Sequence, residues 1–220
     1  MKDAEILSYV DHTLLTATAS WPEVEQLCNE TIKYSTASVC VPPCYVARIR
    51  KSFPKLNICT VIGFPLGYDA TTTKAAAART AIEDGADELD MVINITDVKN
   101  GDFRSIAAEI ATLKEIAGQR VLKVIVETCY LTKDEKVALC GAVTEAGADY
   151  IKTSTGLGTA GAMMEDVELF KQHIGPNVKI KASGGIRTRE DMVAFLEAGC
   201  ARLGTSSAVK LLSGGAAAEY

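Results

Sequence analysis

The chain has 220 residues, 48% of them hydrophobic, and a formal net charge of −5. A chain of this size can bury one substantial core, and we expect a single domain over residues 1–220. Charges of both signs are interspersed, which argues against a nucleic-acid partner. The N-terminus has no apolar signal core and no apolar run is long enough for a bilayer, so we expect a cytoplasmic protein without a membrane partner.

Seven cysteines are scattered among apolar residues, an odd number without a CxxC pair. Cys40 and Cys44 have a CxxxC spacing, and the chain has two histidines, His12 and His173. This set lacks the ligand pattern of a zinc site, so we predict no metal. We expect the cysteines to be free thiols in a reducing compartment.

From the N-terminus onward, short apolar runs alternate with amphipathic helical patterns. This alternation is typical of βαβ units and a parallel sheet. Eight strands fit a (β/α)8 TIM barrel, here with a short N-terminal helix and a flexible C-terminal tail. An open doubly wound sheet is the main alternative, although no GxGxxG follows the first strand. The predicted strands cover residues 9–12, 38–41, 57–62, 88–93, 121–127, 149–152, 178–182 and 201–204, and the predicted helices cover residues 21–34, 44–51, 71–84, 103–117, 133–146, 163–172 and 189–198.

Three of the predicted helices end in a similar phrase, at residues 83–87, 145–149 and 197–201. Each phrase has a glycine at its centre. Glycine is favoured just after a helix C-terminus, because it adopts a left-handed backbone at little cost. The phrase supports the helix boundaries and carries no chemistry.

Two lysines at the ends of predicted strands are the strongest chemical signal in the chain. Lys152 is followed by Thr-Ser-Thr-Gly and Lys181 by Ala-Ser-Gly-Gly. A buried ammonium is costly, so a lysine in a core loses its proton or finds a partner. Two lysines in one site repel each other, and a neutral amine attacks carbonyl groups to form a Schiff base. The pair therefore indicates covalent amine catalysis.

Several further charged residues lie on or beside the predicted strands. Alternation places Glu88 and Asp90 on one face of their strand, where each needs a partner. The lysines are the expected partner for Asp90, whereas a structural ion pair inside the barrel is the favoured alternative for Glu88. Asp11 follows the first strand and is either a site residue or a turn residue.

The same alternation applies to three other charged residues. Lys123 and Glu127 share a face of their predicted strand, so they form an internal ion pair or one of them adjoins the site. Lys179 shares a face with Lys181 but lies nearer to the bottom of the barrel, and we interpret it as structural.

Glycine-containing turns follow the last three predicted strands, at residues 155–158, 183–186 and 203–207. Backbone N–H groups exposed by glycine bind phosphate well, and barrels often bind phosphate after their last two strands. Tight turns alone would explain any one of them. Three in this order predict a phosphorylated small molecule as the ligand.

Two segments, DYIKTSTG at 149–156 and KASGGIR at 181–187, resemble the Schiff-base strand and the second-lysine strand of deoxyribose-phosphate aldolases. Residues 88–92 look like the acidic strand of that family, and residues 11–15, 40–42 and 203–207 match in order. The similarity covers essentially the whole chain. It implies a class I aldolase on a (β/α)8 barrel, without metal or organic cofactor.

The resemblance also implies roles for individual residues. Lys152 would form the imine, Lys181 would be the neighbouring cation that favours its neutral amine, and Asp90 would relay protons with Lys181 and a water. Some family members carry a lysine where this chain has Leu157, so one phosphate contact is either missing or supplied by Arg187. Some members also end in a tyrosine that reaches the site. The implied substrate-binding and phosphate-binding residues are Asp11, Thr13, Cys40, Thr155, Gly156, Gly184, Gly185, Arg187, Gly204, Ser206, Ser207 and Tyr220.

The activity implied by the resemblance is reversible cleavage of 2-deoxy-D-ribose 5-phosphate to acetaldehyde and D-glyceraldehyde 3-phosphate, carried out by a homodimer. The partners would be small sugar phosphates and aldehydes. Two alternatives stay open: a phosphate-binding barrel isomerase or epimerase with Asp or Cys bases, and a non-catalytic sugar-phosphate-binding barrel. The isomerase explains the glycine turns but gives Lys152 no role.

Overall fold

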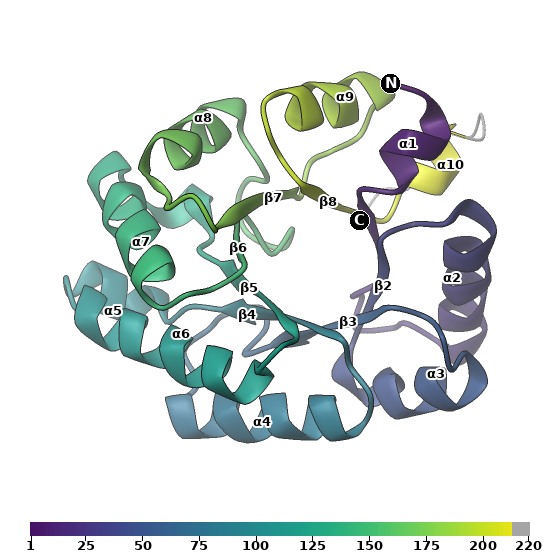
Figure 1. Cartoon of the computed structure of the whole chain (residues 1–220), viewed down its shortest axis with the longest axis horizontal. Coiled ribbons are helices and arrows are strands. Elements are labelled where there is room, and N and C mark those ends of the chain that lie inside the picture. The colour runs from purple at the N-terminus through teal and green to yellow at the C-terminus, as the bar shows by residue number, and fades with distance from the viewer. Residues whose placement is uncertain (213–220) are drawn as a thin grey trace.

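The computed structural model describes residues 1–212, in which eight parallel strands close into one barrel (Figure 1). The strands are β1 (Val10–Thr13), β2 (Ser38–Val41), β3 (Ile58–Ile62), β4 (Glu88–Val92), β5 (Val121–Ile125), β6 (Tyr150–Lys152), β7 (Lys179–Ser183) and β8 (Arg202–Thr205). Each strand pairs with the next along the chain, and β1 pairs with β8, with Val10 opposite Leu203. This closure excludes the open doubly wound sheet and confirms the predicted (β/α)8 barrel.

Helices surround the strands as an outer ring, and α1 lies beside α10 (Figure 1). The helices are α1 (Asp3–Leu7), α2 (Trp21–Tyr34), α3 (Val46–Ser52), α4 (Thr71–Glu83), α5 (Ile95–Lys99), α6 (Phe103–Ala117), α7 (Lys133–Glu145), α8 (Met164–His173), α9 (Arg189–Glu197) and α10 (Ala208–Leu212). Two single turns of 3-10 helix are η1 (Pro43–Tyr45) and η2 (Thr128–Tyr130). The short N-terminal helix is confirmed as α1.

Local sequence signals explain where these helices begin and end. At the start of α7, the N–H of Glu135 donates to the Thr132 hydroxyl and the N–H of Thr132 donates to the Glu135 carboxylate. This reciprocal pair satisfies two backbone donors that the helix leaves free. The glycines in the recurring phrase, Gly85, Gly147 and Gly199, have φ values of 106°, 72° and 111°, which only glycine adopts at little cost.

Three details differ from the sequence-based prediction. Helices α5 and α10 were not predicted, because five residues are too few to show a helical period. The predicted helix 44–51 is divided into η1 and α3. The segment begins at Pro43, directly after Pro42, and the Tyr45 N–H donates to the Pro42 carbonyl three residues earlier, which is the pattern of a 3-10 turn.

Strand β5 also ends earlier than predicted, at Ile125 rather than at residue 127. Glu127 has a left-handed backbone with φ of 56°, so the chain turns away from the sheet there. The alternation that would have paired Lys123 with Glu127 therefore stops before Glu127.

The two faces of the strands differ sharply in chemistry. Outward residues such as Val39, Leu89 and Val124 join one apolar core with the helices. The inward face carries charged, hydroxyl and thiol groups instead of the branched apolar residues that usually fill such a barrel. These inward residues include Asp11, Ser38, Cys40, Cys59, Glu88, Asp90, Lys123, Lys152, Lys181 and Arg202, and most of them are fully buried. A functional site is therefore built into the barrel interior.

Two expectations concern the chain's surroundings and its end. Within residues 1–212, none of the helices has both the length and the apolar character that crossing a membrane requires. The predicted C-terminal tail and Tyr220 lie outside the described residues.

Candidate active site

Asp90, on β4, is the centre of a buried cluster of charged side chains inside the barrel. Its Oδ2 atom accepts hydrogen bonds from Lys152 at 2.8 Å and from Lys181 at 2.6 Å. Its Oδ1 atom accepts hydrogen bonds from Lys123 at 2.8 Å and from the Cys59 thiol at 3.1 Å. The predicted pairing of Asp90 with the two strand-end lysines is thus seen directly in the geometry, and Lys123 is added as a third lysine.

Asp11, on β1, holds Lys181 from the side opposite Asp90. The ammonium of Lys181 donates to Oδ2 of Asp11, and Asp11 Oδ1 accepts from the Ser38 hydroxyl at 2.7 Å and from Arg202. Asp11 lies within β1, paired with Ser38 of β2, so the alternative of a turn residue is wrong. Lys181 is therefore fixed between two carboxylates.

A second layer of ion pairs lies below Asp90, nearer to the N-terminal ends of the strands. Glu88 pairs with Lys123, and also with Arg202 at 3.1 Å. Arg202 and Lys179 each lie 5.7 Å from the ring centre of Tyr150. Glu88 thus forms the structural ion pair that the sequence favoured. Lys179 is an exposed residue at the bottom of the barrel.

Mutual attraction within the cluster outweighs the cost of burying its charges. Burial would raise the pKa of Asp90, but Lys123, Lys152 and Lys181 hold that pKa well below its usual range. The pKa of Asp11 is lowered in the same way by Lys123 and Lys181. Burial would lower the pKa of Lys181, but Asp11 and Asp90 raise it above its usual value. At neutral pH the two aspartates are ionised and Lys181 is an ammonium.

Counting charges singles out Lys152. The cluster contains three carboxylates, Asp11, Glu88 and Asp90, and four basic side chains, which are Lys123, Lys152, Lys181 and Arg202. Lys123, Lys181 and Arg202 each contact at least two of these carboxylates, whereas Lys152 contacts Asp90. Lys152 thus has the fewest carboxylate partners among the four basic side chains of the cluster.

Lys152 also faces a cavity of about 180 Å³ at the C-terminal ends of the strands. The same cavity is lined by ten of the predicted site residues, namely Lys152, Thr13, Thr155, Gly156, Gly184, Gly185, Arg187, Gly204, Ser206 and Ser207. Asp90, Lys181, Asp11 and Cys40 are fully buried behind it. The site thus has an open upper part for a ligand and a closed, charged floor, with Lys152 between them.

The glycine turns approach each other closely around this cavity. A side chain at Gly184, whose φ is 79°, would lie 3.1 Å from the Cα atoms of both Gly156 and Gly161. A side chain at Gly204 would lie 3.2 Å from Cε of Lys181. Glycine fits these positions because a side chain would crowd the neighbouring backbone at Gly184 and Lys181 at Gly204.

Glu127 supports the loop that follows Lys152, a role not predicted from the sequence. Its carboxylate accepts hydrogen bonds from the Thr155 N–H, at 3.2 Å, and from the Thr155 hydroxyl. The Thr155 hydroxyl in turn accepts from the Leu157 N–H at 3.0 Å. Burial raises the pKa of Glu127. Glu127 has a left-handed backbone although it is not a glycine, and such residues are often found at functional sites.

Two groups of side chains have spacings compatible with a metal ion. Ligand atoms of Cys40, Cys59 and Asp90 lie within 4.8 Å of one another, as do those of Asp11, Cys59 and Glu88. In both groups the carboxylates already accept hydrogen bonds from ammonium or guanidinium groups. Such a positively charged surrounding disfavours a divalent cation, so we assign no metal to either group.

The DeoC/LacD family aldolase profile matches residues 6–214. The chain belongs to this family of aldolases. It is 60% identical to a deoxyribose-phosphate aldolase of Clostridium botulinum (strain Alaska E43 / Type E3), over 97% of both chains. It is 54% identical to the deoxyribose-phosphate aldolase of Clostridioides difficile (strain 630), over 98% of this chain and 99% of that protein.

Solved structures agree with this assignment. The aldolase QR15 superposes with a TM-score of 0.91 at 37% identity, covering 95% of both chains. The tetrameric deoxyribose phosphate aldolase from Aeropyrum pernix superposes with a TM-score of 0.87 at 33% identity, over 96% of this chain and 91% of that one. The protein is therefore an enzyme of the lyase class, which excludes the non-catalytic barrel and disfavours the isomerase or epimerase.

Proposed function

We propose that this enzyme reversibly cleaves 2-deoxy-D-ribose 5-phosphate to acetaldehyde and D-glyceraldehyde 3-phosphate through a Schiff base on Lys152. The observation that carries the proposal is the position of Lys152, whose amine meets Asp90 on one side and lines the cavity on the other. The names of the relatives with 54% to 60% identity support the same substrate.

In the first half of the reaction, the neutral amine of Lys152 attacks C1 of the open-chain sugar. Loss of water leaves a protonated imine, which is an electron sink. A water held by Asp90 and Lys181 removes the proton of the C3 hydroxyl. The C2–C3 bond then breaks, D-glyceraldehyde 3-phosphate leaves, and an enamine remains on Lys152.

In the second half, the enamine is protonated at carbon and the resulting imine is hydrolysed to release acetaldehyde. Lys181 is suited to these proton transfers, because its ammonium is held in place and donates to the same carboxylate oxygen of Asp90 as Lys152 does. General acid–base help of this kind typically contributes roughly 10²–10⁴-fold to the rate. Asp11 acts as a positioning residue, since it anchors Lys181 from behind.

The phosphate of the substrate would bind at the upper part of the cavity. Backbone N–H groups of Gly184, Gly185 and Gly204, with the hydroxyls of Ser206 and Ser207, supply donors there. Arg187 is exposed at the same cavity and adds the positive charge that Leu157 cannot supply. Cys40 lies beneath the cavity rather than in its lining, and we assign it no contact with phosphate.

A direct assay tests this proposal. The full chain is incubated with 2-deoxy-D-ribose 5-phosphate, and acetaldehyde and D-glyceraldehyde 3-phosphate are measured separately. We expect both products in equal amounts from the parent and none above background from Lys152→Leu. Lys179→Leu is the matched control, because Lys179 lies at the barrel bottom and should be dispensable. A folded parent that releases neither product would overturn the proposal.

Three broader expectations belong with this function. We infer a homodimer from the family resemblance, which sedimentation analysis of the purified chain would test. We also infer one domain over residues 1–220 and a cytoplasmic location, where sugar phosphates are found. A tetramer, as named for the Aeropyrum pernix relative, would contradict the homodimer.

A further inference from the structure

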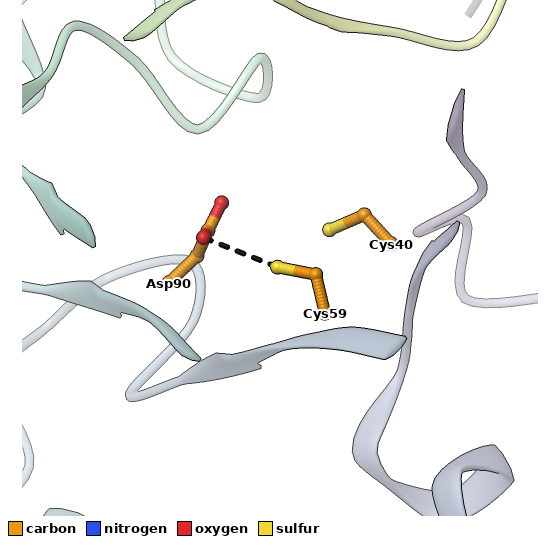
Figure 2. Close-up of side chains that lie close together, drawn as sticks. All are labelled: Cys40, Cys59 and Asp90. Atoms are coloured by element: carbon orange, nitrogen blue, oxygen red, sulfur yellow. Dashed lines mark hydrogen bonds between the residues drawn. The ribbon is translucent and has the colours of Figure 1, made fainter. Parts of the chain in front are cut away.

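Two cysteines lie side by side under the cavity and have no part in the proposed reaction. Cys40 of β2 and Cys59 of β3 are register partners in neighbouring parallel strands, and both are fully buried (Figure 2). Their sulfur atoms lie within 4.8 Å of each other. Neighbouring strands are about 4.8 Å apart, which is within the Cα separation that a disulfide spans.

Cys59 is tied to the charged floor of the site. Its thiol donates a hydrogen bond to Oδ1 of Asp90 at 3.1 Å, the contact drawn in Figure 2. Lys123 also contacts the sulfur atom of Cys59, at 3.4 Å. The position of the Cys59 sulfur is therefore coupled to the carboxylate that holds both Lys152 and Lys181.

The two thiols differ in acidity in the manner of an attacking and a resolving cysteine. The adjacent Cys59 side chain, together with Lys181 and Lys152 nearby, lowers the pKa of Cys40 against the opposing effects of burial and Asp90. Burial, the contact with Cys40 and the charge of Asp90 together raise the pKa of Cys59. A thiolate is the form that reacts with peroxides, and redox-active cysteines are commonly placed beside a second thiol.

A small oxidant has a short route to this pair. Cys40, Cys59 and Val61 form a separate apolar cluster against which Leu15 and Phe64 pack. Leu15 and Phe64 also line the substrate cavity. Leu15 and Phe64 are therefore the side chains that separate this apolar cluster from the cavity, and an oxidant that reaches Cys40 from the cavity requires one of them to move aside.

We propose that Cys40 and Cys59 form an oxidation site that reacts with a small hydroperoxide and closes to an intramolecular disulfide, which lowers aldolase activity. The inhibitory effect rests on the proposed function, whereas formation of the disulfide does not. The remaining five cysteines have different surroundings. Cys44 is exposed, and Cys129 is half-buried with its thiol directed at the Glu127 carboxylate. Cys28, Cys140 and Cys200 are buried, and burial raises their pKa values to about 12.

The oxidation takes place in two steps. The thiolate of Cys40 attacks one peroxide oxygen, the O–O bond breaks, and a sulfenic acid and hydroxide are formed. The thiol of Cys59 then displaces the hydroxyl of the sulfenic acid, the S–S bond forms, and its proton leaves with the hydroxyl as water. The peroxide is reduced by two electrons, which come from the two sulfur atoms.

Closure changes the surroundings of Asp90. The Cys59 sulfur must move toward Cys40 and no longer carries a proton, so Oδ1 of Asp90 loses a hydrogen bond while Lys123 remains. The carboxylate is then free to tilt toward Lys123, away from Lys152 and Lys181. Loss of one hydrogen bond to a charged group corresponds to about a tenfold effect, which is the decrease in turnover that we expect.

Disulfide mapping on the full chain provides the test. Cys40 and Cys44 lie in one tryptic peptide, residues 34–48, while Cys59 lies in residues 56–74. Reduced parent and Cys44→Ser are treated with hydrogen peroxide, excess peroxide is removed with catalase, and free thiols, linked peptides and aldolase activity are measured. Cys44→Ser makes the linkage unambiguous and controls for the exposed thiol.

We expect a peptide linking Cys40 to Cys59 in both proteins, loss of two thiols, about a tenfold lower turnover, and recovery with dithiothreitol. Cys59→Ser keeps a hydroxyl donor for Asp90 but cannot form the disulfide. After peroxide treatment, its turnover compared with its own untreated turnover should therefore show no loss that dithiothreitol restores. Its Cys40 should instead be trapped as a sulfenic acid by dimedone.

Absence of the linked peptide would overturn the oxidation site, and a linked peptide with full activity would overturn its inhibitory role. A reduced parent that cleaves no deoxyribose phosphate would contradict the proposed function instead, while peptide mapping would still decide whether the disulfide forms.

Discussion

Lys152 and Lys181 donate hydrogen bonds to one and the same atom, Oδ2 of Asp90, at 2.8 and 2.6 Å. They are register partners in neighbouring strands, so the sheet itself places the two amines side by side. One of them faces the cavity and the other is fixed between two aspartates. This asymmetry supports the proposed division of roles, with Lys152 as the nucleophile and Lys181 as the neighbouring cation.

The role of Lys181 can be tested by removing its charge. We predict that Lys181→Met lowers turnover by roughly 10²–10⁴-fold, because it removes the ammonium that relays protons beside the imine. Steady-state kinetics on deoxyribose phosphate would measure this loss, with Lys179→Met as control because Lys179 is on the same strand but exposed. Equal losses in both variants would show that the effect is structural rather than catalytic.

Asp90 and Glu88 offer a matched pair on one strand. Each is a buried, inward carboxylate that pairs with Lys123, but Asp90 also contacts Lys152 and Lys181. Removing one partner of a buried ion pair costs about 3–5 kcal/mol, so Asp90→Asn and Glu88→Gln should both lower the free energy of unfolding.

The two variants should differ in turnover. We expect Asp90→Asn to lose roughly 10²–10⁴-fold in kcat and Glu88→Gln to lose much less. Urea unfolding and kinetics on the same preparations would separate the two effects. A Glu88→Gln enzyme as slow as Asp90→Asn would contradict a specific role of Asp90 in the reaction.

The lowered pKa values of Asp90 and Asp11 predict a loss of stability in acid. Both values lie below the ordinary 3.8, so the unfolded chain takes up protons first as the pH falls. Their contribution is complete above about pH 5 and decreases toward the folded-state pKa values, by up to about 1.4 kcal/mol per pH unit for each group. Urea unfolding between neutral and acid pH would measure the slope. Asp11→Asn should reduce it, and an unchanged slope would contradict the assignment.

Glu127 is expected to act through its hydrogen bonds rather than its charge. Glu127→Gln keeps one acceptor oxygen for Thr155 and removes a charge whose burial raises its pKa, so stability at neutral pH should not fall. Glu127→Ala leaves the Thr155 donors unpaired, at a cost of about 1–3 kcal/mol, and should raise KM for the phosphorylated substrate. If Glu127→Gln were as impaired as Glu127→Ala, the carboxylate charge itself would be required.

Much of the architecture could be predicted from the sequence, because strand and helix patterns alternate with clear glycine stops. Lys152, Lys181 and Asp90 were predictable for a related reason: charged residues in apolar strands near their C-terminal ends have few other interpretations. The turn glycines around the cavity followed from their order along the chain.

Other parts of the site depend on closure of the barrel. The contacts of Arg202 with Asp11 and Glu88 exist because β8 returns to β1, which no local pattern reveals. The sequence predicts Glu127 at the end of a strand, because Val126 before it is apolar. The left-handed backbone of Glu127 is not predicted, because such a backbone is usually signalled by glycine. The sequence does not indicate that Cys59 lies beside Cys40, because only the register of β2 and β3 brings the two together.

The most direct test of the central claim is to trap the covalent intermediate. The parent is incubated with acetaldehyde, reduced with borohydride and analysed by peptide mass mapping. The account predicts one reduced ethyl adduct on Lys152, absent from Lys152→Leu and present in Lys179→Leu. A folded parent without an adduct, or an adduct on Lys181 or Lys123 instead, would contradict the assignment of Lys152 as the nucleophile.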